Sequence, residues 1–260
     1  NILKEKDLKF NIFVHQKWTP FLMMLTLFNS IQGMNDFAED STYRLSASID
    51  VDGNAPLNLS TMQAPSDIPV PAPMVLAGWW ADKFNRLYGN GVSMPKLKGV
   101  NLTVDLLPER RSSAIDSLWV SASEAQPGEE LTVKAFLRPY RGERVERTVQ
   151  MRLPAGLPKG DYRILVSDAD TLNRLQSAAG GLNRYLDVPQ TVSLLQQERS
   201  NHKLYFSLVH PRPTLYLEDK ALPNLPSSVM NVIQSQKTAG RPLLSSGETA
   251  TEQTTLNFEQ

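Results

Sequence analysis

The chain has 260 residues, 41% apolar and 21% charged, which is enough to build one large domain or two ordinary ones and is not a disordered composition. Its 27 basic and 27 acidic side chains cancel, so nothing in the charge points to a nucleic-acid-binding face, and none is expected. Cysteine is absent, which excludes disulfides, thiolate zinc sites and a cysteine nucleophile.

The ends of the chain suggest a fragment of a longer protein. It begins with Asn1 rather than Met, and residues 254–258 look like a strand interrupted at its end. The longest apolar run, residues 21–28, is too short to cross a bilayer, so no transmembrane segment is expected. Because the absence of cysteine fits a bacterial exported protein, we expect a periplasmic, outer-surface or extracellular location, with any export signal upstream of this segment.

Residues 1–95 are predicted to form a mixed strand and helix region that packs on an upstream domain. Residues 8–15 alternate between apolar and polar and predict a strand. Thr19-Pro20 predicts the start of a helix that ends near Gln32. Apolar side chains cover nearly its whole circumference, which predicts burial on all sides, with a membrane-inserting helix as the alternative.

The same region continues with a hairpin and a second helix. Residues 42–51 and 56–59 are predicted to pair around a turn at 52–54. A helix over 74–88 carries Trp79 and Trp80 in its apolar stripe. An exposed tryptophan pair could bind a sugar or a partner, although packing in the core is the simpler interpretation.

Residues 96–168 are predicted to form the central domain, because short alternating segments follow one another between turn signals. The turns are expected at 126–129, 140–143 and 157–161, and residues 126–136 are typical of an immunoglobulin-like strand. The fold class is therefore α+β and mostly β, an immunoglobulin-like antiparallel β-sandwich flanked by short helices and hairpins.

Residues 169–260 are predicted to form a third region of helices and one strand. Helices are expected over 169–179, capped by Asp168 or Asp170, over 191–199, and from Ser227 or Ser228 to Ile233. A strand is expected over 203–209, and the polar stretch 236–251 is expected to be a loop.

No catalytic, cofactor-binding or metal-binding residue is predicted. His15, His202 and His210 have no metal-ligand spacing, and the last two flank a strand of roughly 26 Å, so surface or capping roles are expected. Ser245-Ser246-Gly247 comes nearest to a peptidase serine motif but lies in the predicted loop. No cofactor is expected.

Two acidic groups could hold a cation, and both have simpler interpretations. Asp168 and Asp170 follow a strand, but one of them is expected to cap the next helix. Asp50, Asp52 and Asn54 resemble the start of an EF-hand loop that lacks its glycine and its closing glutamate. The arginines of the sandwich alternate with Glu109, Glu143 and Glu146, which predicts cross-strand ion pairs rather than a phosphate site.

Five phrases together resemble the C-terminal region of exported proteins, notably acidobacterial ones, that carry a SpoIVB-type serine peptidase domain upstream. The phrases are QKWTP (16–20), TVDLLPERR (103–111), FLRPYRGE (136–143), LVSDADTLNR (165–174) and LPNLPSSV (222–229). In that family the nucleophile is the serine of a Gly-Met-Ser-Gly-Ser-Pro-like motif. That motif is absent from this sequence, so the resemblance carries over no catalytic residue.

The resemblance implies a non-catalytic accessory and interaction region of an exported serine peptidase-like protein. Its expected partners are the upstream peptidase domain of the same protein and other envelope proteins. Two alternatives remain open. One is a module that binds carbohydrate or cell-wall polymer through Trp79 and Trp80, and the other is a structural subunit of an envelope assembly held by strand addition.

Overall fold

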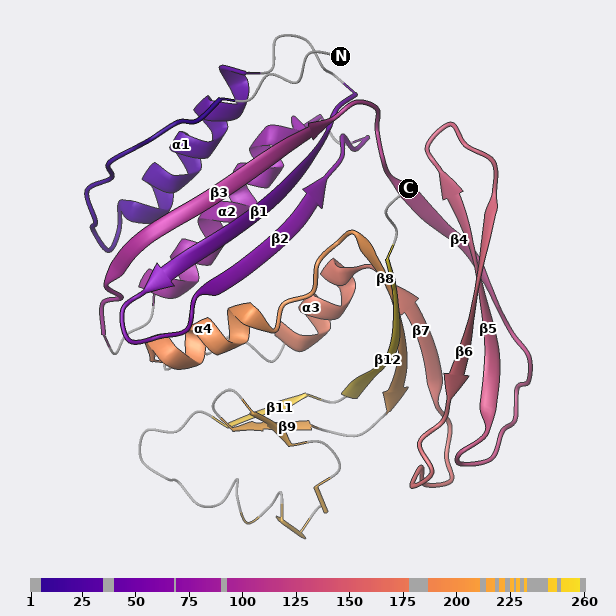
Figure 1. The fold of residues 1–260 in the computed structure, drawn as a ribbon. Helices are drawn as coiled ribbons and strands as arrows, with labels where there is room; N and C mark the ends of the chain where they lie inside the picture. The colour runs from indigo at the N-terminus through magenta and orange to yellow at the C-terminus, as the bar shows by residue number, and fades with distance from the viewer. Residues whose placement is uncertain are drawn as a thin grey trace. The chain divides into compact units, whose positions relative to one another are not determined.

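The protein, seen in a computed structural model, has an α+β fold with mostly antiparallel strands (Figure 1). The structure describes residues 6–34, 40–67, 69–89, 93–177, 187–210, 214–217, 220–222, 225–226, 228–229, 232, 243–246 and 249–257. For residues 176–177, 210, 214–217, 220–222, 243–246 and 249–257 it describes the backbone but not the side chains. The chain forms two compact units. The first comprises Asn1–Arg110 and Asp187–Leu195, and the second Arg111–Leu186 and Gln196–Gln260.

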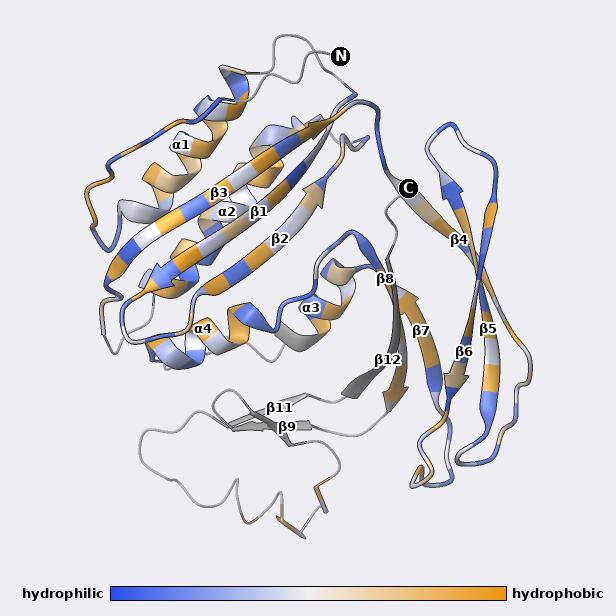
Figure 2. Cartoon of the chain, viewed as in Figure 1, coloured by the Kyte–Doolittle hydropathy of each residue, from blue (hydrophilic) through white to orange (hydrophobic). Residues whose placement is uncertain are grey.

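The first unit is built on a three-stranded sheet in the order β2-β1-β3, with β1 over Thr42–Val51, β2 over Leu57–Gln63 and β3 over Leu97–Leu107. Both pairings are antiparallel, and the β1–β2 hairpin is confirmed. Gly53 in its turn has a φ of 75°, which glycine adopts without steric cost. Figure 2 shows hydrophobic and hydrophilic residues alternating along these strands, as a sheet with one buried face requires.

Two helices, α1 over Thr19–Gln32 and α2 over Ala72–Tyr88, pack beside each other against this sheet (Figure 1). A third helix, α4 over Val188–Gln196, joins the same core although it lies about a hundred residues later in the sequence. Asp187 and Gln190 form a reciprocal capping box at its start, each side chain accepting the other residue's backbone N–H. The predicted helix over 191–199 is thus present, but it starts earlier.

Three expectations for the first unit are wrong. Residues 8–15 belong to no strand. Helix α1 is not buried on all sides, because Met23, Leu27 and Ile31 face the core while Phe21 is 44% exposed. The strand expected within the 96–168 domain, β3, instead pairs with β1. In each case the segment does not pair or pack with the elements that its local pattern predicted.

The second unit contains two sheets whose side chains share a core. One has the order β4-β5-β6, with β4 over Ser113–Val120, β5 over Glu130–Pro139 and β6 over Val145–Arg152. The other has the order β12-β8-β7, over Thr249–Asn257, Lys203–His210 and Arg163–Ser167. Buried residues of both sheets, Ala135, Met151 and Phe206 among them, lie in one cluster.

The rest of the second unit consists of helix α3 over Ala169–Ser177 and a small sheet in the order β10-β9-β11, over Lys220–Leu222, Thr214–Leu217 and Leu243–Ser246. Strand β11 and the first residues of β12 fall within the stretch 236–251 that was expected to be a loop, so that expectation is wrong for residues 243–246 and 249–251. The helix expected from Ser227 or Ser228 to Ile233 falls largely outside the described residues.

Candidate interaction surfaces

The histidines do not come together as a catalytic group. The Nδ1 of His15 accepts the backbone N–H of Lys17. The Nδ1 of His202 contacts the hydroxyl of Ser200, two residues away in the turn that precedes β8. The side chain of His210 lies outside the described residues. The Ser200–His202 contact is local to one turn, and both Ser200 backbone groups bond the Tyr205 hydroxyl, so this serine has the environment of a turn residue.

The acidic groups have structural roles. A carboxylate oxygen of Asp168 accepts the backbone N–H of Thr171 at 2.9 Å and so caps α3. Asp52, in the hairpin turn, accepts the Lys98 ammonium at 2.8 Å. In the part of the chain that the structure describes, no three histidine or acidic side chains lie close enough together to hold a metal ion.

The Asp52–Lys98 contact makes a testable prediction about titration. The Lys98 hydrogen bond lowers the pKa of Asp52 and, reciprocally, raises the pKa of Lys98. The resulting stabilisation is complete above the ordinary pKa of Asp52 and below the ordinary pKa of Lys98. It is lost as the pH falls through the lowered pKa of Asp52 or rises through the raised pKa of Lys98.

Lys98→Met should therefore move the pKa of Asp52 back up toward its ordinary value, as measured by NMR titration of the Asp52 carboxyl carbon. Lys17→Met, at an exposed lysine elsewhere in the first unit, should leave it unchanged. An unaltered Asp52 titration in Lys98→Met would show that the contact does not persist in solution.

The tryptophan pair is part of the first core rather than an open platform. Trp80 is 2% exposed, and its ring meets that of Phe84 edge-on at 4.9 Å between centroids. Trp79 is half-buried, and the ammonium of Lys83 lies 4.7 Å above its ring. A sugar would have to displace this lysine to stack on Trp79, which argues against the carbohydrate alternative.

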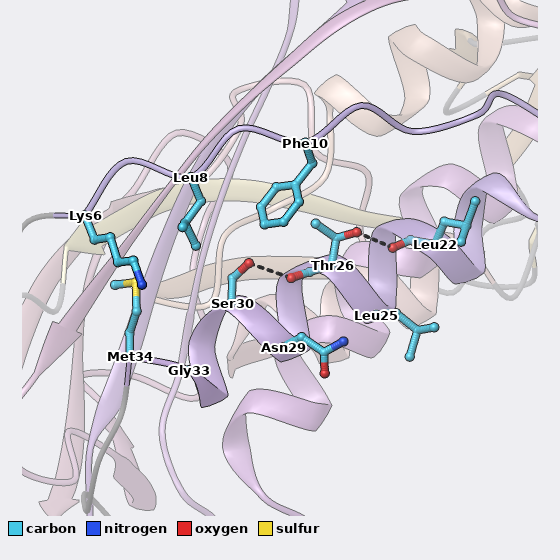
Figure 3. A pocket seen from close by; sticks show the side chains of 10 residues that line it. All are labelled: Lys6, Leu8, Phe10, Leu22, Leu25, Thr26, Asn29, Ser30, Gly33 and Met34. Carbon is cyan, nitrogen blue, oxygen red and sulfur yellow. Dashed lines mark hydrogen bonds between the residues drawn. The ribbon is translucent and has the colours of Figure 1, made fainter.

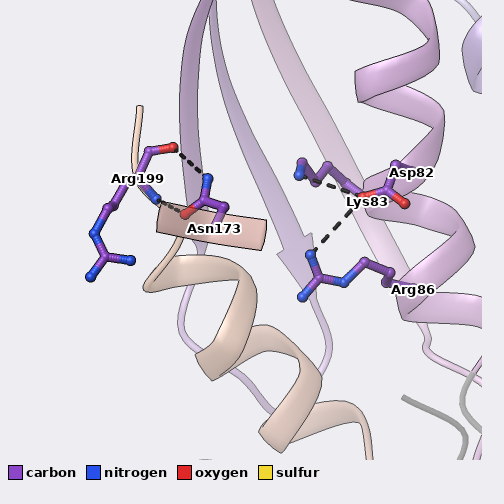
Figure 4. Close-up of polar contacts among 5 residues, drawn as sticks. All are labelled: Asp82, Lys83, Arg86, Asn173 and Arg199. Atoms are coloured by element: carbon purple, nitrogen blue, oxygen red, sulfur yellow. Dashed lines mark hydrogen bonds and ion pairs between the residues drawn. The ribbon is translucent and has the colours of Figure 1, made fainter. Parts of the chain in front are cut away.

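A polar cluster on α2 accompanies these tryptophans. Figure 4 shows Lys83 and Arg86 directed at the carboxylate of Asp82, at 3.6 and 4.0 Å. The side chain of Lys83 is only 4% exposed, and burial lowers the pKa of Arg86 while Asp82 opposes that shift. Figure 4 also shows Asn173, whose side-chain amide exchanges two hydrogen bonds with the backbone of Arg199. Both groups serve packing within their own units.

Strand β4 presents apolar side chains that its own unit does not cover. Leu118 lies opposite Ala135 and Ile115 opposite Leu137, and directly opposite residues share one face of a sheet. Ala135 and Leu137 are buried in the core, yet Ile115 is 39% and Leu118 42% exposed. Trp119, on the outer face, is 48% exposed. We call Ile115, Leu118 and Trp119 the β4 edge surface.

A bulge explains how Ile115 and Leu118 come to lie on one face although they are three residues apart. Side chains in a regular strand alternate, so such a pair would point in opposite directions. The register of β4 against β5 shifts between Ile115 and Ser117, which leaves Asp116 as the extra residue. The Asp116 carboxylate forms ion pairs with Arg138 and Arg144, both at 3.1 Å.

The expected cross-strand ion pairs are present, although with partly different partners. Arg138 and Arg144 pair with Asp116, while Lys134 pairs with Glu146 at 2.8 Å. The charges of Lys134, Arg138 and Arg144 are therefore neutralised by these carboxylates. The sheet does not offer a phosphate-binding face at these three positions.

A second apolar surface lies along the N-terminal segment and the start of α1. Its members are large, exposed side chains, and we call them the aromatic N-terminal surface: Leu8, Phe10, Phe13, Trp18 and Phe21. Phe13 is 78% exposed and Trp18 58%, and the rings of Trp18 and Phe21 meet edge-on. The segment is anchored at its far end, where the Thr19 hydroxyl accepts the His15 N–H and Gln16 donates to the Tyr88 carbonyl.

The segment and α1 enclose an open groove of about 320 Å³. Figure 3 shows Leu8 and Phe10 on one side of it and the helix on the other, with Lys6 and Met34 at one end. The hydroxyls of Thr26 and Ser30 each donate to the carbonyl four residues earlier, so they are satisfied within the helix. The groove is consequently more apolar than its composition suggests.

Comparison with known proteins finds no matching family model, no similar curated protein and no similar solved structure. Among the described helices, none has both the length and the apolar content to span a bilayer. Sequence reasoning did not identify the β4 edge surface or the aromatic N-terminal surface. The available signals were the tryptophans at 18 and 119, for which the sequence predicted no role.

Proposed function

We propose that this chain is a non-catalytic interaction region of an exported serine peptidase-like protein and that it binds a protein partner by strand addition at β4. The observation that carries the proposal is the β4 edge surface, where Ile115 and Leu118 lie on the core face of the sheet yet remain exposed. An exposed edge strand with apolar side chains is an aggregation hazard unless a partner covers it.

The geometry of β4 suits an added strand. In the described part of the chain β4 pairs with β5 alone, so the backbone groups of its other edge are available to a neighbouring strand. A strand placed there could cover Ile115 and Leu118 with its own apolar side chains and extend the hydrogen bonding of the sheet. Strand addition of this kind gains affinity from the main chain and specificity from alternate side chains.

The two sheets of the second unit support a finer proposal about its fold. Because β4-β5-β6 and β12-β8-β7 bury side chains in one cluster, we propose an immunoglobulin-like sandwich that is open beside β4. The partner strand would close this opening. The resemblance to exported proteins with a SpoIVB-type domain suggests the peptidase domain of the same protein as the partner, and an exported location for both.

The proposal is tested by replacing one residue of the edge. Leu118→Lys should weaken binding of the purified chain to the peptidase domain of the same protein about tenfold or more, as measured by isothermal titration calorimetry. The reason is that the lysine places a charge where the added strand packs. Leu106→Lys is the matched control, since Leu106 is 45% exposed and belongs to the first unit, and it should leave the affinity unchanged.

Two results would contradict the proposal. One is equal affinity of the Leu118→Lys variant and the unchanged chain, which would move the contact away from β4. The other is hydrolysis of a fluorogenic peptide library by the purified chain that is lost in Ser200→Ala or His202→Ala. These two residues form the serine–histidine contact described above and would then be catalytic.

A further inference from the structure

We propose that the aromatic N-terminal surface binds the surface of a bilayer containing anionic phospholipids. This inference is independent of the strand-binding function, because it concerns different residues in the other unit. It begins from the exposure of Phe13 at 78%, Trp18 at 58% and Phe10 at 55%. Aromatic side chains are enriched at the boundary between lipid headgroups and acyl chains, where their rings are partly dehydrated.

The charges around these rings favour an anionic surface. Residues 6–34 contain three lysines, Lys6, Lys9 and Lys17, and one acidic residue, Asp7, for a net charge of +2. The whole chain is neutral, so its remaining residues together carry −2. Lysines beside exposed aromatic residues are the pattern of segments that lie on anionic membranes, because the ammonium groups reach the headgroups while the rings insert below them.

The groove between the N-terminal segment and α1 adds an apolar depression to this surface. Leu8, Phe10, Leu22 and Leu25 line it, and Lys6 lies at one end (Figure 3). The internally bonded hydroxyls of α1 leave no strong demand for water there. An acyl chain from the adjacent leaflet could therefore fill the groove while Lys6 contacts its headgroup.

Partial insertion fits this surface better than a span. Helix α1 has 14 residues, shorter than the roughly 20 needed to cross a bilayer, and its Met23, Leu27 and Ile31 are occupied by the protein core. What remains for the lipid is the outer face of the helix and the segment before it. Such an element lies in the plane of the interface.

The test measures co-sedimentation of the full chain with vesicles. Vesicles of phosphatidylcholine mixed with phosphatidylglycerol should bind the chain, and vesicles of phosphatidylcholine alone should bind it at least about tenfold more weakly. Phe13→Asp and Trp18→Asp should each lower the affinity for the mixed vesicles about tenfold, and Trp18→Phe should retain it. Because these side chains are exposed, the variants should fold, which circular dichroism checks.

The matched control is Trp119→Asp, which removes a tryptophan of similar exposure from the other unit and should leave vesicle binding unchanged. Absence of binding to the mixed vesicles overturns the proposal, as does an equal loss in Trp119→Asp. Self-association of the chain in light scattering that Phe13→Asp abolishes, without any vesicle binding, would assign this surface to protein contact instead and overturn the lipid proposal.

Discussion

Phe84→Ala is expected to lower the free energy of unfolding of the first unit by about 3–5 kcal/mol, the usual cost of emptying a phenylalanine site in a packed core. Phe84 is 0% exposed, and its ring packs edge-on against Trp80, which is itself buried. Trp80 joins the side chains of α2 to those of the sheet, so the vacated space cannot be filled without moving either element.

Urea unfolding followed through the amide hydrogen exchange of β1 measures this effect within the first unit. Phe13→Ala is the matched control, because the same side chain is removed where it is 78% exposed, and it should change stability by no more than about 0.5 kcal/mol. Equal losses in the two variants would show that Phe84 is not packed as the structure has it.

Leu195→Ala is expected to destabilise the first unit by about 2–5 kcal/mol, although the residue comes more than a hundred positions after β1. Leu195 is 0% exposed and lies in the core cluster that contains Leu45 and Trp80. Val188 and Val192 complete the face of α4 that enters this core. The truncation therefore leaves a cavity in a core formed largely by the first 110 residues.

Hydrogen exchange distinguishes this placement from a purely local effect. Leu195→Ala should reduce the protection of amides in β1, while Leu106→Ala, at a 45% exposed leucine, should cost about 1 kcal/mol or less. Protection lost only in β8, the strand that follows α4 in the sequence, would mean that α4 packs elsewhere.

The elements that sequence reasoning predicted well are those specified by neighbouring residues. The hairpin of β1 and β2 follows from alternation and a glycine turn. Strands β5 and β6 follow from the same alternation of apolar and polar residues. Asp168 caps α3, as an aspartate directly before a helix commonly does. In these cases the pattern lies within one strand, one cap or one hairpin turn, so a short stretch of sequence is enough to predict the element.

Prediction was wrong where the cause is a distant partner. Residues 8–15 have the pattern of a strand, but hydrogen bonds to a neighbouring strand are what stabilise one, and this segment runs beside α1 instead. The apolar circumference of α1 predicted burial on all sides. Its core residues face α2 and the sheet, while Phe21 and the groove remain open, because burial depends on how many elements pack against a helix.

The sequence did not reveal either candidate surface, again because the exposure of a side chain depends on distant segments of the chain. Nothing in the local pattern distinguishes Ile115, Leu118 and Trp119 from buried residues of a strand. Only their register against β5 and their exposure in the folded chain reveal the surface. The bulge at Asp116, which brings Ile115 and Leu118 to one face, becomes visible only in the register against β5, where Asp116 also pairs with Arg138 and Arg144.

By itself the sequence determined the period of strands such as β1, β5 and β6, the cap of α3, the hairpin turn and the absence of cysteine chemistry, because these depend on residue type and short spacing. Only the tertiary structure decided that β3 belongs with β1, that α4 returns to the first core, and that β4 and the N-terminal segment keep apolar side chains exposed. Burial is a property of contacts between distant segments, so the sequence pattern alone did not reveal which apolar side chains stay exposed.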